Sequence, residues 1–221
     1  MGVDRASRVT QFVFDQHNAR ASWSVPPKPQ HALRVVTWNL HQQSGAHGDL
    51  LTTDDCWRLL HKLDSDVVCL QEVQHAFPLL TYQTQLNAEG VVLACAWPLT
   101  RVETVRLGVD RVLVAATTTL RNGRQVRLGA THLEPYEPRE QRKQLEKMPR
   151  DVQLLGGDFN TSTAPAYLPW LTADGNRKPT CWFGTRIDMV LHDRRVLEPL
   201  DCFVVPSTLS DHVPVVADYS L

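Results

Sequence analysis

The sequence lacks several features that would mark common classes of protein. Its 221 residues carry a formal net charge of −1, so no general excess of positive charge indicates a nucleic-acid or acidic-membrane partner. Any contact with a polyanion must therefore be local. No apolar run approaches the ~18 residues that a membrane-spanning helix needs. We expect a monomer with no segment inserted in a membrane.

Cysteine is scarce and scattered. The five cysteines are odd in number and none of them forms a CxxC spacing, which argues against a disulfide framework and against a cysteine-based zinc site. The first residues also lack the apolar stretch of a signal peptide. These features favour a reduced, intracellular protein, cytoplasmic or nuclear.

The chain divides into a short extension and one large domain. Residues 1–32 include the stretch SVPPKPQ at 24–30, in which consecutive prolines interrupt regular structure. With 43% hydrophobic residues, the chain can bury a sizeable core. We predict an N-terminal extension and linker over 1–32 and a single domain over 33–221.

Buried strands are predicted along this domain, and polar side chains recur where they end. Runs such as LRVVTW at 33–38 and DVVCL at 66–70 are apolar and rich in β-branched residues. The polar residues at the strand ends are Asn39, Glu72, His132, Asp158 with Asn160, Asp188, and Ser210-Asp211-His212. Because unpaired buried charge is costly, so many polar endings predict that the strands converge on one site.

Helices and a hairpin complete the predicted framework. A helix is predicted to begin at Thr53, and its core face would carry Trp57, Leu59, Leu60 and Leu63. A charged helix is predicted over 137–147, and the Asn-Gly pair at 122–123 indicates a hairpin. Between residues 82 and 106 the apolar alternation is weak, and only VVLACAW at 91–97 stands out as a strand.

The stretch LLGGDFNT at 154–161 organises the prediction. Its apolar run is expected to end at Gly156 and Gly157, which would let the chain turn. Asp158 and Asn160 would share a face, because residues two apart point the same way along an extended backbone. An Asx-turn or a helix cap is the alternative structure for such residues. The two interpretations are compatible if the turn presents both side chains to a substrate.

The residue types indicate phosphoryl chemistry. Oxygen ligands such as Glu72 favour Mg²⁺ or Mn²⁺ over Zn²⁺, with water and substrate phosphate completing the coordination. Asp158 could orient or deprotonate an attacking water, and Asn160 could donate to a developing phosphorane oxygen. His132 and His212 could donate to phosphoryl oxygens or protonate a leaving group, while Asp188 could hold an imidazole in one tautomer.

Six motifs in order carry a resemblance to a known family. They are TWNL at 37–40, LQEV at 70–73, THLEP at 131–135, GGDFN at 156–160, RIDMVL at 186–191 and SDHVPV at 210–215. Over about residues 33–221 the chain resembles the endonuclease/exonuclease/phosphatase superfamily. The resemblance implies a four-layered α/β/β/α sandwich of two mixed sheets, with the site at one end.

The resemblance also implies roles for the matching residues. Asn39, Glu72 and Asp211 would hold the divalent metal ion, and Asp158 and Asn160 would act on the water and the phosphate. His212 and Asp188 would form a pair, and His132 would contact the phosphate or the leaving oxygen. These roles agree with those argued from the residues alone.

The substrate is predicted less sharply than the chemistry. THLE and GGDFN look most like the tyrosyl-DNA phosphodiesterase branch, so we predict a phosphodiester hydrolase acting on nucleic acid, as a nuclease or in DNA repair. Trp182 and Arg186 are predicted to contact substrate. His41 is expected to be a loop residue without a metal role. The alternatives are an inositol phosphate phosphatase or sphingomyelinase-like phospholipase of the same fold, and a non-catalytic binding module.

Overall fold

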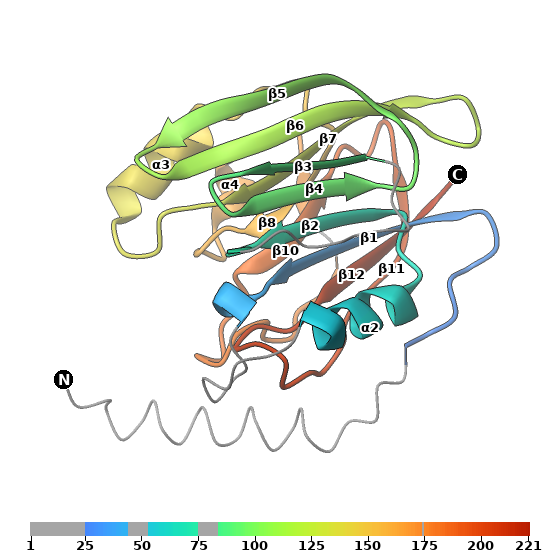
Figure 1. Cartoon of the computed structure of the whole chain (residues 1–221). Coiled ribbons are helices and arrows are strands. Elements are labelled where there is room, and N and C mark those ends of the chain that lie inside the picture. The colour runs from blue at the N-terminus through green and yellow to red at the C-terminus, as the bar shows by residue number, and fades with distance from the viewer. Residues whose placement is uncertain (1–24, 44–52, 75–83, 174) are drawn as a thin grey trace.

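Two six-stranded β-sheets pack face to face, with helices on their outer sides (Figure 1). This computed structural model describes residues 25–43, 53–74, 84–173 and 175–221. The predicted four-layered α/β/β/α sandwich is confirmed. Residues 1–24 of the predicted extension lie outside the described residues. Within the described part of the chain, no helix is both long and apolar enough to cross a membrane.

The first sheet has the strand order β11-β12-β1-β2-β4-β3. Its one parallel pair is β1 with β2, and Asn39 at the end of β1 lies opposite Gln71 at the end of β2. β12 runs antiparallel to β1, so it begins where β1 ends. The strands are β1 (Ala32–Asn39), β2 (Val67–Gln71), β3 (Thr84–Ala88), β4 (Val91–Cys95), β11 (Glu198–Val204) and β12 (Val215–Ser220).

The second sheet repeats this plan with the order β5-β6-β7-β8-β10-β9. β7 and β8 are parallel, with His132 opposite Asp158, and the antiparallel β10 begins with Asp188 opposite Asp158. The strands are β5 (Leu99–Gly108), β6 (Arg111–Thr119), β7 (Gln125–His132), β8 (Leu154–Asp158), β9 (Thr172–Ala173) and β10 (Asp188–His192).

The core has three parts because each sheet buries both of its faces. Side chains such as Val35, Cys69 and Ala130 fill the space between the sheets. Apolar residues of α2 (Thr53–Leu63) recur at helical spacing and cover the outer face of the first sheet. Outside the second sheet lie α3 (Pro138–Glu146) and α4 (Ala164–Tyr167). A 3₁₀ turn, η1 (His41–Gln43), follows β1.

The strands β3, β5 and β11, which the sequence did not predict, are edge strands of their sheets. β5 is an edge strand whose residues are mostly exposed, so its sequence shows no apolar alternation. β11 is likewise an edge strand, and β3 pairs only with β4. Trp57, predicted to be core, is only partly buried, whereas the neighbouring Cys56 of the same helix is fully buried.

The prediction that two glycines turn the chain after residue 155 is wrong. Gly156 and Gly157 lie inside β8, which continues to Asp158. A Cβ at Gly156 would lie 2.8 Å from Cys69 Sγ in the facing sheet, and one at Gly157 would lie 2.5 Å from the Thr131 carbonyl oxygen. These glycines therefore permit close packing around β8, which lets the strand carry Asp158 into the site.

Candidate active site

The pairing of the strands brings the predicted polar residues to one end of the sandwich. The two parallel pairs, β1 with β2 and β7 with β8, place Asn39, Glu72, His132 and Asp158 at or beside their carboxyl ends. The antiparallel β10 starts there with Asp188. The convergence expected from the polar strand endings is therefore seen in the structure.

A pocket of about 1040 Å³ opens at this end. Every residue predicted for the site lines it except Asp188, which is fully buried. The predicted residues that line it are Asn39, Glu72, His132, Asp158, Asn160, Trp182, Arg186, Asp211 and His212. The structure thus brings these predicted residues together around one pocket, while their assignment as a functional site and the role of each stay predictions.

Asn39 ties the carboxylates of the two sheets together. Its side chain is buried, and its Nδ2 donates to Glu72 Oε1 at 3.2 Å and to Asp158 Oδ2 at 3.0 Å. Asn39 Oδ1 accepts a hydrogen bond from the His41 backbone N–H at 2.9 Å. Ser210 Oγ donates to the Asn39 carbonyl at 2.7 Å, which fixes the segment before β12 beside the end of β1.

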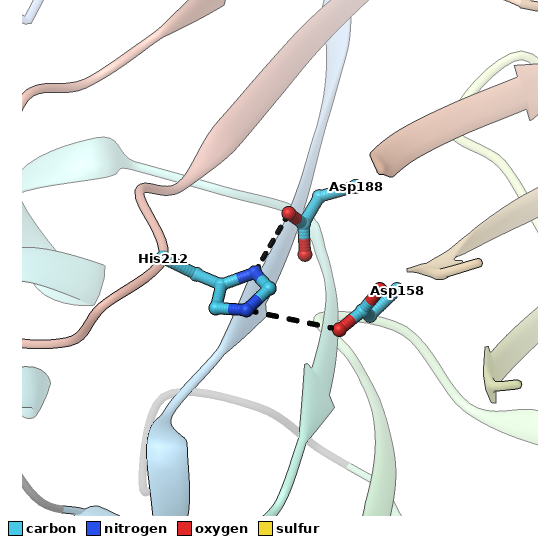
Figure 2. A group of neighbouring side chains, drawn as sticks. All are labelled: Asp158, Asp188 and His212. Atoms are coloured by element: carbon cyan, nitrogen blue, oxygen red, sulfur yellow. Dashed lines mark hydrogen bonds and ion pairs between the residues drawn. The ribbon is translucent and has the colours of Figure 1, made fainter. Parts of the chain in front are cut away.

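Asp158, Asp188 and His212 form the buried centre of the site. Figure 2 shows the His212 ring between the two carboxylates, with Nδ1 2.8 Å from Asp188 Oδ2 and Nε2 3.9 Å from Asp158 Oδ2. Thr180 Oγ1 accepts the Asp188 backbone N–H at 3.1 Å and positions the start of β10. Trp38 Nε1 donates to the His212 carbonyl at 3.1 Å. The predicted His–Asp pair is thus within hydrogen-bonding distance.

Burial and charge perturb the ionisation of this centre. Burial alone would lower the pKa of His212, but Asp188, Asp158 and Asp211 outweigh it and raise that pKa well above its usual value. Burial, together with the neighbouring Asp188, raises the pKa of Asp158. The physical consequence is a charged imidazole held against a carboxylate that binds protons more readily than a solvated one.

His132 behaves in the opposite way. Burial lowers its pKa, Asp158 opposes this shift, and the positive charges of Arg111 and His212 add to it, so that the resulting pKa is about 4. Its Nε2 lies 3.7 Å from Asp158 Oδ2. The site therefore places a neutral imidazole and a charged imidazole on the same carboxylate oxygen at neutral pH.

The chain turns sharply after Asp158. Asp158 Oδ1 accepts the backbone N–H of Asn160 at 2.9 Å, which is the Asx-turn weighed as an alternative from the sequence. Asn160 has φ 52°, so the extended i, i+2 geometry ends at Asp158. Asn160 Nδ2 donates to the Leu133 carbonyl at 3.0 Å, and Gln141 Nε2 donates to the Asn160 carbonyl at 3.0 Å. One amide N–H of Asn160 remains for a substrate.

Glu72 also adopts a backbone conformation that side chains disfavour. Its φ is 55°, in the left-handed region, and it follows directly on β2. Such strain costs of order 1 kcal/mol or more and is concentrated at functional sites. The carboxylate is half-buried and lines the pocket.

Among the pocket residues that the sequence prediction missed, four carry a charged, imidazole or aromatic side chain. Arg111 is the first residue of β6, and Tyr136 and Phe183 lie in a bend and a turn, where no apolar periodicity marks a position. His41, expected to be an ordinary loop residue, also lines it, with Nδ1 3.6 Å from Asp211 Oδ1. The position of Phe183 directly after Trp182 was the one available signal, and the two ring centroids lie 4.1 Å apart.

The residues fit a divalent cation. Asp158, Asp188 and His212 each offer a ligand atom within 4.8 Å of one another, which makes them a possible metal group. Glu72 and Asp211 line the open pocket beside Asn39 and supply the oxygen ligands that Mg²⁺ or Mn²⁺ prefers. The Asp158, Asp188 and His212 group and the Glu72 and Asp211 side of the pocket are therefore both candidate cation sites.

Two packed β-sheets thus carry a buried centre of two aspartates and a histidine at the edge of an open pocket. This fold and site are those of a phosphoesterase. The endonuclease/exonuclease/phosphatase family model matches residues 36–212, well over half of the chain. The chain therefore belongs to the endonuclease/exonuclease/phosphatase family and is a phosphoesterase of that family. No curated protein sequence matches the chain significantly.

Solved structures show the same fold at low sequence identity. The endonuclease/exonuclease/phosphatase of Beutenbergia cavernae DSM 12333 is 20% identical, with TM-score 0.71, covering 87% of this chain and 72% of that one. Humanized D. rerio TDP2 is 17% identical, with TM-score 0.66, covering 87% and 100%. A mannosyl-6-phosphatase of Bacteroides thetaiotaomicron VPI-5482 is 15% identical, with TM-score 0.67, covering 86% and 100%. At such identities the likeness concerns the fold alone.

Proposed function

We propose that this phosphoesterase is a divalent-metal-dependent phosphodiester hydrolase that acts on nucleic acid through in-line attack by water. The observation that carries the proposal is the Asp158 carboxylate, whose Oδ2 lies 3.7 Å from His132 Nε2 and 3.9 Å from His212 Nε2. The arrangement combines one proton acceptor with two imidazole donors at the edge of an open pocket. Phosphodiester hydrolysis needs both functions.

Asp158 would accept the proton of the attacking water. Burial raises its pKa, which makes the carboxylate a stronger base than a solvated one. Asn39 Nδ2 and the Asn160 backbone N–H fix the two carboxylate oxygens at 3.0 Å and 2.9 Å. A base held in one orientation can align the water for attack without a further ordering step.

The two histidines would stabilise charge on the phosphoryl group. His212 keeps its proton and is oriented by Asp188 at Nδ1, so Nε2–H can donate to a phosphoryl oxygen. His132 is neutral and can donate one N–H to a phosphoryl or leaving oxygen. Asn160 would add a neutral donor from the turn after β8.

A divalent cation would be held by Glu72 and Asp211, with Asn39 beside them. When bound, it would neutralise the phosphoryl oxygens and stabilise the charge that develops on them. Mg²⁺ or Mn²⁺ suits these oxygen ligands.

The pocket walls support a nucleic-acid substrate. Arg111 and Arg186 add positive charge, while Trp182, Phe183 and Tyr136 add aromatic surface. Phe183 is 58% exposed and Tyr136 is 85% exposed, although aromatic residues are usually buried. Cations interleaved with aromatic rings suit a phosphate chain with bases that can stack. The motifs THLE at 131–134 and GGDFN at 156–160, which resemble the tyrosyl-DNA phosphodiesterase branch, support a role in processing DNA ends.

A substrate panel tests this proposal. Single-stranded oligonucleotide, the same strand carrying a 5′-phosphotyrosyl group, an inositol phosphate, sphingomyelin and mannose 6-phosphate would each be assayed with Mg²⁺ and with EDTA. We expect Mg²⁺-dependent turnover of one or both nucleic-acid substrates. Turnover confined to inositol phosphate, sphingomyelin or mannose 6-phosphate would overturn the substrate, and no turnover of any compound would favour a non-catalytic binding module.

A further inference from the structure

A set of arginines and aromatic rings lies on the outer side of the second sheet, away from the pocket. Thr161 and Ser162 line the active-site pocket, and the same segment then runs through α4 to Thr172, which pairs with His192 at the far end of β10. β10 begins in the site at Asp188. Residues 161–173 therefore connect the site with the opposite end of the sandwich.

Two arginine–aromatic pairs occur along this segment. The Arg142 guanidinium of α3 lies 5.8 Å from the ring centroid of Tyr167, and the Arg150 guanidinium lies 6.0 Å from that of Trp170. Tyr167 is 39% exposed, and both arginines are exposed. The Arg142 charge is paired with Glu146, whose Oε1 lies 2.8 Å from Arg142 Nε. Each pair therefore offers the flat face of a guanidinium beside a ring, on which a further π system can stack.

The second pair opens into a separate pocket of about 500 Å³. Arg150, Trp170, Arg194 and Arg195 line it, together with Asp193. The acidic Asp193 is already neutralised, because Arg195 Nη2 lies 2.7 Å from its Oδ2. Among the described residues, Arg150 and Arg194 form no ion pair. Within the part of the chain that the structure describes, these two exposed positive charges thus have no paired carboxylate, in a chain whose net charge is −1.

We propose that Arg142, Tyr167, Arg150, Trp170 and Arg194 form an outer track that binds a single-stranded nucleic acid several nucleotides beyond the scissile phosphate. Phosphates would pair with Arg150 and Arg194, and bases would stack against the Arg142–Tyr167 and Arg150–Trp170 surfaces. The inference rests on the proposed function, because the strand that enters the track is the strand cleaved in the pocket. Stacking needs unpaired bases, so the track favours single strands over duplex.

The test uses Arg150→Glu/Arg194→Glu and compares a dinucleotide with a twelve-nucleotide single strand of the same sequence context. For the long strand, we expect kcat/KM to fall about tenfold or more, since two phosphate contacts are lost. The slope of log kcat/KM against log salt should fall by about 1.4, because each contact on a single strand contributes about 0.7. For the dinucleotide, kcat/KM should not change.

A matched control separates the track from general charge. Arg58→Glu/Lys62→Glu makes the same charge change on exposed positions of α2, outside the other sheet. We expect this variant to behave like wild type on both substrates. Tyr167→Ala, which removes no charge, should lower kcat/KM for the long strand about fivefold and leave the dinucleotide unaffected.

The outcomes distinguish this inference from the proposed function. If wild type cleaves both substrates but Arg150→Glu/Arg194→Glu loses no more activity on the long strand than the α2 control, the track is refuted. Equal losses on both substrates would also refute it, since they would indicate damage to the site. If wild type cleaves neither nucleotide substrate, the proposed function fails and the track fails with it.

Discussion

Two buried groups of charges lie in this fold, and they are built differently. At the start of β1, Arg34 Nε and Nη2 contact the Asp218 carboxylate at 2.8 Å and 2.7 Å. Arg34 Nη1 donates to the carbonyls of Leu63 and Pro26. Both charged side chains are 1% exposed. This pair is balanced, with each nitrogen of the guanidinium engaged.

The centre of the active site is unbalanced. Asp158 and Asp188 are buried beside each other, and His212 supplies one positive charge between them. Asp188 Oδ1 has no hydrogen-bond partner within the described ranges. Burial raises the pKa of Asp158, whereas a balanced pair would lower it. The comparison indicates that the Arg34–Asp218 pair serves the stability of the fold. The active-site centre instead keeps the Asp158 carboxylate reactive at a cost in stability.

The largest expected effect is the loss of activity on changing Asp158 in the active-site centre. Asp158→Asn removes the proton acceptor and should lower kcat about 10³-fold, within the usual range for a general base. It also removes a charge that burial disfavours, so the free energy of unfolding should fall by no more than about 1 kcal/mol. Steady-state kinetics and urea unfolding on the same preparation check both. Near-normal turnover would mean that another residue handles the water.

The balanced pair should respond in the opposite sense. Asp218→Asn leaves the Arg34 guanidinium buried without a carboxylate, and we expect a loss of about 3 kcal/mol in the free energy of unfolding. At a temperature where the variant stays folded, kcat should be close to wild type, because Asp218 lies at the far end of β12 from the pocket.

A double variant checks the cause of that loss. Arg34→Met/Asp218→Leu removes both charges together and should recover most of the stability lost in Asp218→Asn. If the double variant is no more stable than the single one, the loss comes from packing around β1 and β12 and not from an unpaired charge.

The sequence predicted which polar residues come together because strand ends are visible in the sequence. Apolar runs ending at Asn39, Glu72 and Asp158 mark where each strand stops, and parallel pairing then brings those ends together. The glycines after Leu155 were misread, because a turn and a close contact between sheets both require glycine. Only the facing strand distinguishes the two.

Residues of the pocket wall could not be predicted in the same way. Arg111 begins β6 and Tyr136 lies in a bend between β7 and α3, and their place beside the pocket depends on how far each strand extends and how the sheets stack. The outer track has the same origin, since Arg150 and Trp170 are separated in sequence and meet only through packing outside the second sheet. Local sequence patterns carry no information on contacts between residues that are distant in the sequence.

The smallest expected effect concerns the pH dependence of stability. His132 has a pKa of about 4 in the folded protein against an ordinary value near 6.5, so between these values the unfolded chain binds more protons. The free energy of unfolding should therefore fall as the pH drops below 6.5. Replacing His132 with Asn removes this titration, while other titrating groups remain.

Urea unfolding of both proteins between pH 7 and pH 5 isolates the contribution of His132. The stability of wild type relative to His132→Asn should fall by about 2 kcal/mol from pH 6.5 to pH 5, since each unit is worth 1.36 kcal/mol. The same residue should show no such slope above pH 7. A constant difference across the whole range would mean that His132 takes up its proton normally, so that Asp158 balances it as Asp218 balances Arg34.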